Sequence, residues 1–203
     1  MPAETVLYYV HDPMCSWCYA FRPAWMHIQQ QLPTDIRVQY VLGGLAADSD
    51  QPMPLETRAY VQSQWHKIIQ TVPGTVFNFA FWEQCQPRRS TYPACRAVLL
   101  AREQGKEIAM IHAIQDAYYR HAQNPSDTAT LCALAQKIGL NAATFARDLN
   151  AETTQQALLA DIALARSIGG NSFPSLFLQR NGEVRRIAHD YGDAEPTLTE
   201  IKH

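Results

Sequence analysis

The feature that most constrains the fold is a strand–helix–strand pattern in the first 44 residues. Residues 5–11 (TVLYYVH) are rich in β-branched and aromatic side chains, which predicts a strand. Residues 15–31 fit a helix, and we expect Pro23 to bend it. Residues 36–42 (IRVQYVL) predict a second strand, which Gly43 and Gly44 close. Together these segments predict a βαβ unit.

The middle of the chain is predicted to be mostly helical. Residues 45–55 predict a loop, and residues 55–71 an amphipathic helix. The run FNFAFW, residues 77–82, fits a strand and the start of a helix equally well. Residues 93–167 are helical almost throughout, with breaks at Gly105, at 124–125, at Gly139 and near residue 150. Candidate N-caps are Thr128, Asn141 and Thr153.

Strand signals return near the C-terminus. Residues 174–179 (PSLFLQ) predict a strand, Asn181-Gly182 a hairpin turn, and residues 183–188 the partner strand. A short helix follows from Asp193. The order βαβ, helical insert, ββα predicts an α/β fold. One discontinuous domain, residues 1–44 and 168–203, is interrupted between its second and third strands by an inserted helical domain, residues 45–167.

Charge and cysteine content narrow the class of protein. Seventeen basic and nineteen acidic residues argue against nucleic acid and against an anionic membrane surface as partners. No export signal and no apolar run of about 18 residues is visible, which predicts a soluble cytoplasmic protein. The chain has five cysteines, an odd number. In a reducing compartment a close cysteine pair suggests redox catalysis or metal binding rather than a structural disulfide.

The close pair is Cys15-Ser16-Trp17-Cys18, at the start of the first predicted helix. The free N–H groups and the helix dipole stabilise a thiolate at this position. We therefore expect Cys15 to act as the nucleophile and Cys18, one turn further on, to resolve the mixed disulfide. Two thiolates do not fill a zinc site, no second CxxC follows, and His11 is interpreted as a surface group at a strand end. No metal and no cofactor are expected.

These features resemble the DsbA family of thioredoxin-fold proteins. The resemblance rests on DPMCSWCYAF, GGLAADSDQPM, PRRSTYPACRAV and FPSLFL, and it covers essentially the whole chain. Within that family, the chain is similar to the FrnE-like oxidoreductases, which have no obvious export signal. The resemblance implies a thioredoxin-like fold in which Pro174 is cis, lies against the sulfurs and completes the catalytic set with Cys15 and Cys18. It also implies that Phe173 offers its backbone to an extended substrate, and we expect Ser16 and Trp17 to contact substrate as well.

Three departures from the family pattern bear on function. The dipeptide Ser16-Trp17 replaces the Pro-His of periplasmic DsbA, which weakens the expectation of a strong oxidant. Tyr9 stands where related oxidoreductases often carry a buried acid for proton transfer, and either Asp12 or a water molecule is a candidate substitute. The missing export signal favours a reductase, an isomerase or a small-thiol role, with protein or small-molecule thiols and disulfides as partners, glutathione among them.

Two other classes of function stay open at this point. The first is a glutathione-dependent isomerase or transferase, similar to the kappa-class transferases and the hydroxychromene-carboxylate isomerases. Those proteins typically have serine where Cys15 stands, so the intact CxxC counts against this reading. The second is a non-enzymatic module that senses redox state or binds a metal through Cys15 and Cys18.

The remaining candidates have simpler interpretations. Arg88 and Arg89 are either solvated or bind an anion such as the carboxylates of glutathione. Cys85 and Cys95 are favoured as two separate thiols over a second disulfide, and Cys132 is predicted to be a core residue. The aromatic residues of the middle segment are predicted to form the core of the helical domain more than a groove over the active site; they are Trp65, Phe77, Phe79, Phe81 and Trp82.

Overall fold

A four-stranded mixed sheet forms the base of the molecule in the computed structural model, which describes residues 5–203. Its strands are β1 (Thr5–His11), β2 (Ile36–Leu42), β3 (Ser175–Arg180) and β4 (Glu183–Ile187), in the order β2-β1-β3-β4. β1 pairs with β2 in parallel and with β3 antiparallel, and β3 pairs with β4 antiparallel. The four predicted strands and the thioredoxin-like α/β fold are thus confirmed. Residues 1–4 of the predicted first domain lie outside the described residues.

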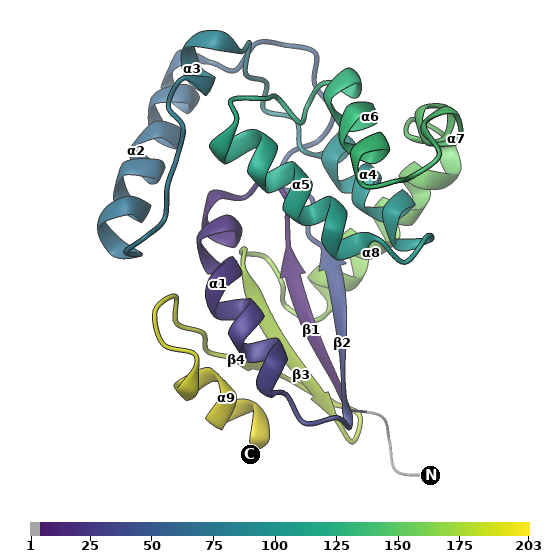
Figure 1. The fold of residues 1–203 in the computed structure, drawn as a ribbon. Helices are drawn as coiled ribbons and strands as arrows, with labels where there is room; N and C mark the ends of the chain where they lie inside the picture. The colour runs from purple at the N-terminus through teal and green to yellow at the C-terminus, as the bar shows by residue number, and fades with distance from the viewer. Residues whose placement is uncertain (1–4) are drawn as a thin grey trace.

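Helices cover both faces of this sheet (Figure 1). On one face α1 (Ser16–Gln31) and α9 (Glu195–Lys202) pack on inward side chains such as Leu7 and Leu178. On the other face α8 (Glu152–Ser167) places Ala165 against Val6 and Val10. The buried side chains of β1 pack alternately against the helices on the two faces, because successive residues of a strand point to opposite faces of the sheet. Pro23 lies inside α1 and does not end it.

The predicted helical insertion lies between β2 and β3. It comprises α2 (Leu55–Thr71), α3 (Phe81–Gln84), α4 (Tyr92–Arg102), α5 (Glu107–Arg120), α6 (Thr128–Lys137), α7 (Ala142–Asp148) and α8. In Figure 1, α2 to α7 gather beyond the C-terminal ends of β1 and β2, where α1 also begins. The insertion is therefore placed to cover the start of α1. Because α8 also covers the sheet, the exact domain boundaries stay a prediction.

Local details of the insertion partly differ from expectation. The run at residues 77–82 forms no strand, and helix α3 begins at Phe81, as the helix alternative proposed. Asn141 is confirmed as an N-cap, since its side chain accepts a 3.0 Å hydrogen bond from the Thr144 N–H. Thr128 and Thr153 were wrong as N-caps, because the extended backbone that precedes each helix falls earlier, at Asp127 and at Ala151.

The core of the insertion is aromatic, as predicted. Trp65 is fully buried, and its ring lies 4.8 Å from that of Phe77 and 4.9 Å from that of Trp82. Phe81, Tyr118 and Tyr119 complete the shell around it. Such contacts between rings add to the burial of their large apolar area. Among residues 5–203, every helix is too short or too polar to cross a bilayer.

Candidate active site

The CxxC segment forms the turn from β1 into α1. Cys15 is the N-cap of α1, with extended backbone, and its N–H donates to the Asp12 carbonyl at 3.0 Å. Cys18 lies in the first turn of the helix. The Cys15 side chain retains 7% exposure, whereas Cys18 is fully buried, and both are free thiols. The N-terminal sulfur thus faces the surface, and the second sulfur lies behind it.

A proline loop from the other end of the chain faces Cys15. The Phe173–Pro174 peptide bond is cis, and the Cys15 thiol donates to the Phe173 carbonyl at 3.6 Å. Gly43 makes room for this loop, since a Cβ at Gly43 would lie 1.9 Å from the Phe173 ring. The Gly43 N–H donates to the His11 carbonyl at 2.7 Å, which fixes the glycine beside the end of β1.

Burial disfavours the ionised forms of Cys18 and of its neighbour Tyr9. Burial first, and then a hydrogen bond with Cys15, raise the pKa of Cys18 well above its usual value. The pKa of Tyr9 is also raised, by burial and then by Cys18 and its other neighbours, and its hydroxyl forms a hydrogen bond with Cys18. Tyr9 therefore stays protonated and cannot serve as the base that its position in related proteins would suggest. It offers Cys18 a hydrogen-bond donor instead.

The dipeptide between the cysteines is held from outside the turn. The Trp65 Nε1–H donates to the Ser16 Oγ at 2.9 Å, and the Trp17 Nε1–H donates to Gln64 at 3.4 Å. The Trp17 ring packs on Tyr191 with centroids 5.2 Å apart. Ser16 and Trp17 thus anchor the site to α2 and to the segment before α9. No local sequence signal marked Gln64 or Tyr191, because both contacts depend on the tertiary fold.

A cavity of about 240 Å³ opens beside Cys15. Arg88 on its wall is engaged, since its guanidinium donates to Asp127 and to the Ser126 carbonyl, both at 2.6 Å. Arg89 is exposed, and no acidic side chain of residues 5–203 pairs with it. Of the aromatic residues in the core of the insertion, only Tyr118 lines this space; Trp65, Phe77, Phe79, Phe81 and Trp82 do not. Its walls come from the CxxC turn, α2, the segment before α4 and the cis-proline loop: Met14, Cys15, Ser16, Trp17, Leu45, Met53, Tyr60, Val61, Gln64, Arg88, Arg89, Thr91, Tyr118, Asn171, Ser172 and Phe173.

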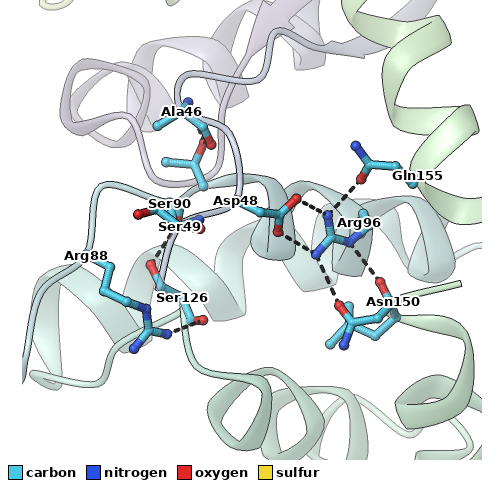
Figure 2. Close-up of polar contacts among 11 residues, drawn as sticks. Ala46, Asp48, Ser49, Arg88, Ser90, Arg96, Ser126, Asn150 and Gln155 are labelled. Atoms are coloured by element: carbon cyan, nitrogen blue, oxygen red, sulfur yellow. Dashed lines mark hydrogen bonds and ion pairs between the residues drawn. The ribbon is translucent and has the colours of Figure 1, made fainter. Parts of the chain in front are cut away.

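One wall of the cavity is a strap, residues 45–53, which carries Leu45 and Met53. Figure 2 shows how polar contacts hold it. Asp48 accepts two 2.8 Å hydrogen bonds from the buried guanidinium of Arg96. The Ser49 N–H donates to the Ser90 Oγ at 3.1 Å, and further hydrogen bonds join Ala46 to Thr91 and Met53 to Pro87.

Arg96 is the hub of this arrangement. It also donates to the Leu149 carbonyl, to Gln155 and to Asn150, at 2.8, 2.8 and 3.1 Å (Figure 2). Such planar, multiply bonded guanidinium contacts are geometrically specific. The strap is therefore fixed to α4 and to the start of α8, and the wall it forms is rigid.

Two expectations about individual residues are wrong. His11 is not a surface group: it is fully buried, stacks on Tyr9 at 5.0 Å, and both ring nitrogens lack hydrogen-bond partners among the described residues. Burial, and then Arg102, lower the pKa of His11 to about 3. Its place on the buried face of β1 follows from the strand register, which puts it beside Tyr9. Cys132 is only partly buried, because its face of α6 borders the core rather than entering it.

The thiols of Cys85 and Cys95 form hydrogen bonds with different partners. The Cys85 thiol donates to the Ala122 carbonyl at 3.1 Å, and the buried Cys95 thiol donates to the Asp12 carboxylate at 3.4 Å. Both are free thiols, in agreement with the interpretation of two separate groups. Within residues 5–203, no three His, Cys, Asp or Glu side chains are placed to hold a metal ion.

A CxxC pair at a helix N-terminus, opposite a cis-proline loop on a mixed four-stranded sheet, defines the class of thiol–disulfide oxidoreductases with DsbA-like architecture. Comparison with known families agrees with this class. The chain belongs to the thioredoxin family, because the family model described as thioredoxin matches residues 8–187. The resemblance to the DsbA family is confirmed.

Solved structures resemble the chain over nearly its whole length. A Nitrosomonas europaea structure, provisionally assigned as a protein disulfide isomerase, has a TM-score of 0.84 and 28% identity, covering 98% of this chain and 97% of that one. The cytosolic disulfide reductase DsbM from Pseudomonas aeruginosa has a TM-score of 0.76 and 25% identity, covering 97% of each chain. A 2-hydroxychromene-2-carboxylate isomerase shares the fold alone, with a TM-score of 0.64 and 13% identity over 89% of this chain and 87% of that one.

A curated relative is the ClpXP adapter protein SpxH from Halalkalibacterium halodurans. It is 22% identical over 175 residues, which cover 83% of this chain. The chain spans 56% of the length of that relative, so the match concerns part of it.

Proposed function

We propose that the chain is a thiol–disulfide oxidoreductase in which Cys15 attacks the substrate and Cys18 resolves the intermediate. One observation carries this proposal: the Cys15 sulfur lies at a cavity and contacts the Phe173 carbonyl, while Cys18 is buried behind it. The Phe173 carbonyl is an acceptor that a substrate N–H can reach in place of the thiol. The positions of the two sulfurs support this order of reaction.

The proposed reaction balances as a two-electron exchange. The Cys15 thiolate attacks one sulfur of the substrate disulfide, and the other sulfur leaves as a thiolate. Cys18 then loses its proton and attacks the Cys15 sulfur, which releases the second substrate thiol. The products are two substrate thiols and the Cys15–Cys18 disulfide. The first leaving thiolate is the natural acceptor of the Cys18 proton, because Tyr9, protonated itself, supplies a donor and not a base.

The cavity favours a small anionic disulfide as substrate, and we propose glutathione disulfide as the representative. Its walls are mostly apolar, with Leu45, Met53 and Val61 among them, and its volume of about 240 Å³ suits part of a peptide-sized ligand. No acidic residue is among its lining residues. Arg89 is the exposed guanidinium at this cavity without an acidic partner, so it is the natural partner for a carboxylate.

We further propose that the reaction runs toward reduction of the substrate, in the cytoplasm. The dipeptide Ser16-Trp17 supplies no histidine to stabilise a thiolate, which disfavours a strongly oxidising pair. The similarity to a protein named as a cytosolic disulfide reductase supports the same direction.

The test is reduction of insulin and of glutathione disulfide by the wild type and two cysteine variants. Cys15→Ser should abolish both activities, whereas Cys132→Ser, on α6 and outside the cavity, should retain them. Full activity of Cys15→Ser would overturn the proposal. Stoichiometric glutathione binding without thiol turnover would instead support the isomerase or transferase alternative, which the cysteine at position 15 disfavours.

A further inference from the structure

Asp12 is a buried carboxylate that joins three segments around the CxxC turn. It is fully buried, and its Oδ1 accepts a hydrogen bond from the Met14 N–H at 2.8 Å. Its Oδ2 accepts hydrogen bonds from the Leu45 N–H and the Thr91 hydroxyl, both at 2.7 Å, and from the Cys95 thiol at 3.4 Å. The side chain therefore ties the turn to the strap and to α4.

The partners of Asp12 suit an ionised carboxylate. Met14 and Leu45 present backbone N–H groups, which only donate. The Thr91 hydroxyl accepts the Ala46 N–H at 3.1 Å, so its own proton is available to Asp12. Burial raises the pKa of Asp12, and the four hydrogen bonds oppose that rise. No cation is among these contacts, so the negative charge is held by hydrogen bonds alone.

Hydrogen bonds of the Asp12 main chain with both cysteines hold its carboxylate close to the cysteine pair. Its carbonyl accepts the Cys15 N–H at 3.0 Å, and its N–H forms a hydrogen bond with the Cys18 sulfur. The other titratable groups facing the pair or Asp12 are tyrosines and one thiol, whose pKa values burial raises, so they stay neutral. They are Tyr9 of β1, Tyr118 and Tyr119 of α5, Tyr191 before α9 and Cys95 of α4. Two guanidinium groups act on members of this set, Arg89 on Tyr118 and Arg96 on Cys95.

We propose that Asp12 is a positioning residue whose buried negative charge destabilises the thiolate form of the Cys15–Cys18 pair relative to its disulfide. The proposal deepens the function proposed above and rests on it. Oxidation of the pair by a substrate disulfide moves two electrons to the substrate and removes the thiolate charge. A nearby carboxylate therefore favours the oxidised pair, and the reduced pair becomes a stronger reductant.

The first test is the equilibrium of the pair with reduced and oxidised glutathione in the Asp12→Asn variant. The amide keeps the shape and removes the charge, so we expect the equilibrium to move about tenfold toward the dithiol, or about 30 mV for a two-electron couple. Thr91→Val is the control, because it removes a hydrogen bond to the same oxygen and keeps the charge; it should move the equilibrium little. Equal shifts in both variants, or none in Asp12→Asn, would overturn the proposal.

A second test uses the wild type and does not depend on how the variants fold. If the Asp12 charge disfavours the thiolate, the thiolate must disfavour the Asp12 charge by the same free energy. The ¹³C-carboxyl resonance of Asp12 should therefore titrate at higher pH in the dithiol form than in the disulfide form. Identical titrations would overturn the role of Asp12. Neither test measures turnover, so failure here is distinct from the loss of the proposed function, which the activity of Cys15→Ser decides.

Discussion

The Cys15 sulfur lies 3.6 Å from the carbonyl oxygen of Phe173, across a separation of 158 residues in the sequence. This contact joins the first strand–helix junction to the loop before β3. The helical insertion between them folds back over the same edge of the sheet, so that the strap and Arg89 face the reactive sulfur. The site is thus assembled from both ends of the chain and from the insertion.

Gly43 tests how strictly the cis-proline loop must be placed. A Cβ in the Gly43→Ala variant would lie 1.9 Å from the Phe173 ring, so the ring and its loop must move. We expect a loss of about 1–3 kcal/mol in the free energy of unfolding, measured in urea, and a lower rate of insulin reduction. Gly192→Ala is the control, since the nearest atom to its Cβ would be 3.6 Å away. Wild-type activity of Gly43→Ala would show that the position of Phe173 does not matter.

Trp65 tests the hydrogen bond between the insertion and the CxxC dipeptide. Trp65→Phe removes the 2.9 Å hydrogen bond to the Ser16 Oγ, whereas Trp82→Phe removes a buried Nε1–H that has no partner among the described residues. Both changes remove similar volume. We expect Trp65→Phe to be the more destabilising by about 1 kcal/mol, measured by urea unfolding. Combining Trp65→Phe with Ser16→Ala should then cost less than the sum of the single changes. An additive result would mean that the hydrogen bond contributes nothing.

His11 tests the cost of a buried imidazole. Its pKa is about 3 in the folded protein, against about 6.5 for an unperturbed histidine. The unfolded chain therefore binds the extra proton, and stability should fall as pH drops below about 6.5, by about 2 kcal/mol between pH 7 and pH 5. His11→Phe should flatten this part of the stability curve, and His66→Phe at an exposed position should not. His112 and His189, whose pKa values burial also lowers, contribute with the same sign in every variant. An unchanged curve in His11→Phe would contradict the assignment.

Arg89 tests the nature of the substrate. Arg89→Ala should raise the KM for glutathione disulfide about tenfold, since a charge-assisted hydrogen bond contributes about 1.5–3 kcal/mol at most. The KM for an uncharged disulfide of similar size should stay the same. Arg166→Ala changes the net charge equally from an exposed position on α8 and serves as the control. An equal effect of both variants, or an equal effect on both substrates, would assign Arg89 no specific role.

Much of the fold follows from local patterns in the sequence. The strands, the helical insertion and the CxxC turn are marked by β-branched runs, helical periodicity and the spacing of two cysteines. The alternation in FNFAFW could not decide between a strand and the start of a helix, because it reflects packing of Phe77 and Phe81 around Trp65. Likewise, hydroxyl side chains alone could not identify which residue is the N-cap of each helix.

The supporting residues of the site were harder to predict, because their partners are distant in the sequence. Asp12 was recognisable as an acid near the pair, but its contacts with Thr91 and Cys95 lie 79 and 83 residues away. Arg96 carried no signal, although it holds the strap through Asp48. His11 was misplaced because the polarity of its side chain suggested exposure, whereas the strand register buries it.

The central claim is that Cys15 is the sulfur that reacts, and trapping tests it most directly. The Cys18→Ser variant should be treated with glutathione disulfide and its adducts located by mass spectrometry. Because the serine hydroxyl of this variant cannot resolve the mixed disulfide, we expect one stable glutathione adduct, on Cys15, although Cys85 and Cys132 are more exposed than Cys15. Adducts on Cys85 or Cys132 with Cys15 unmodified would contradict the account.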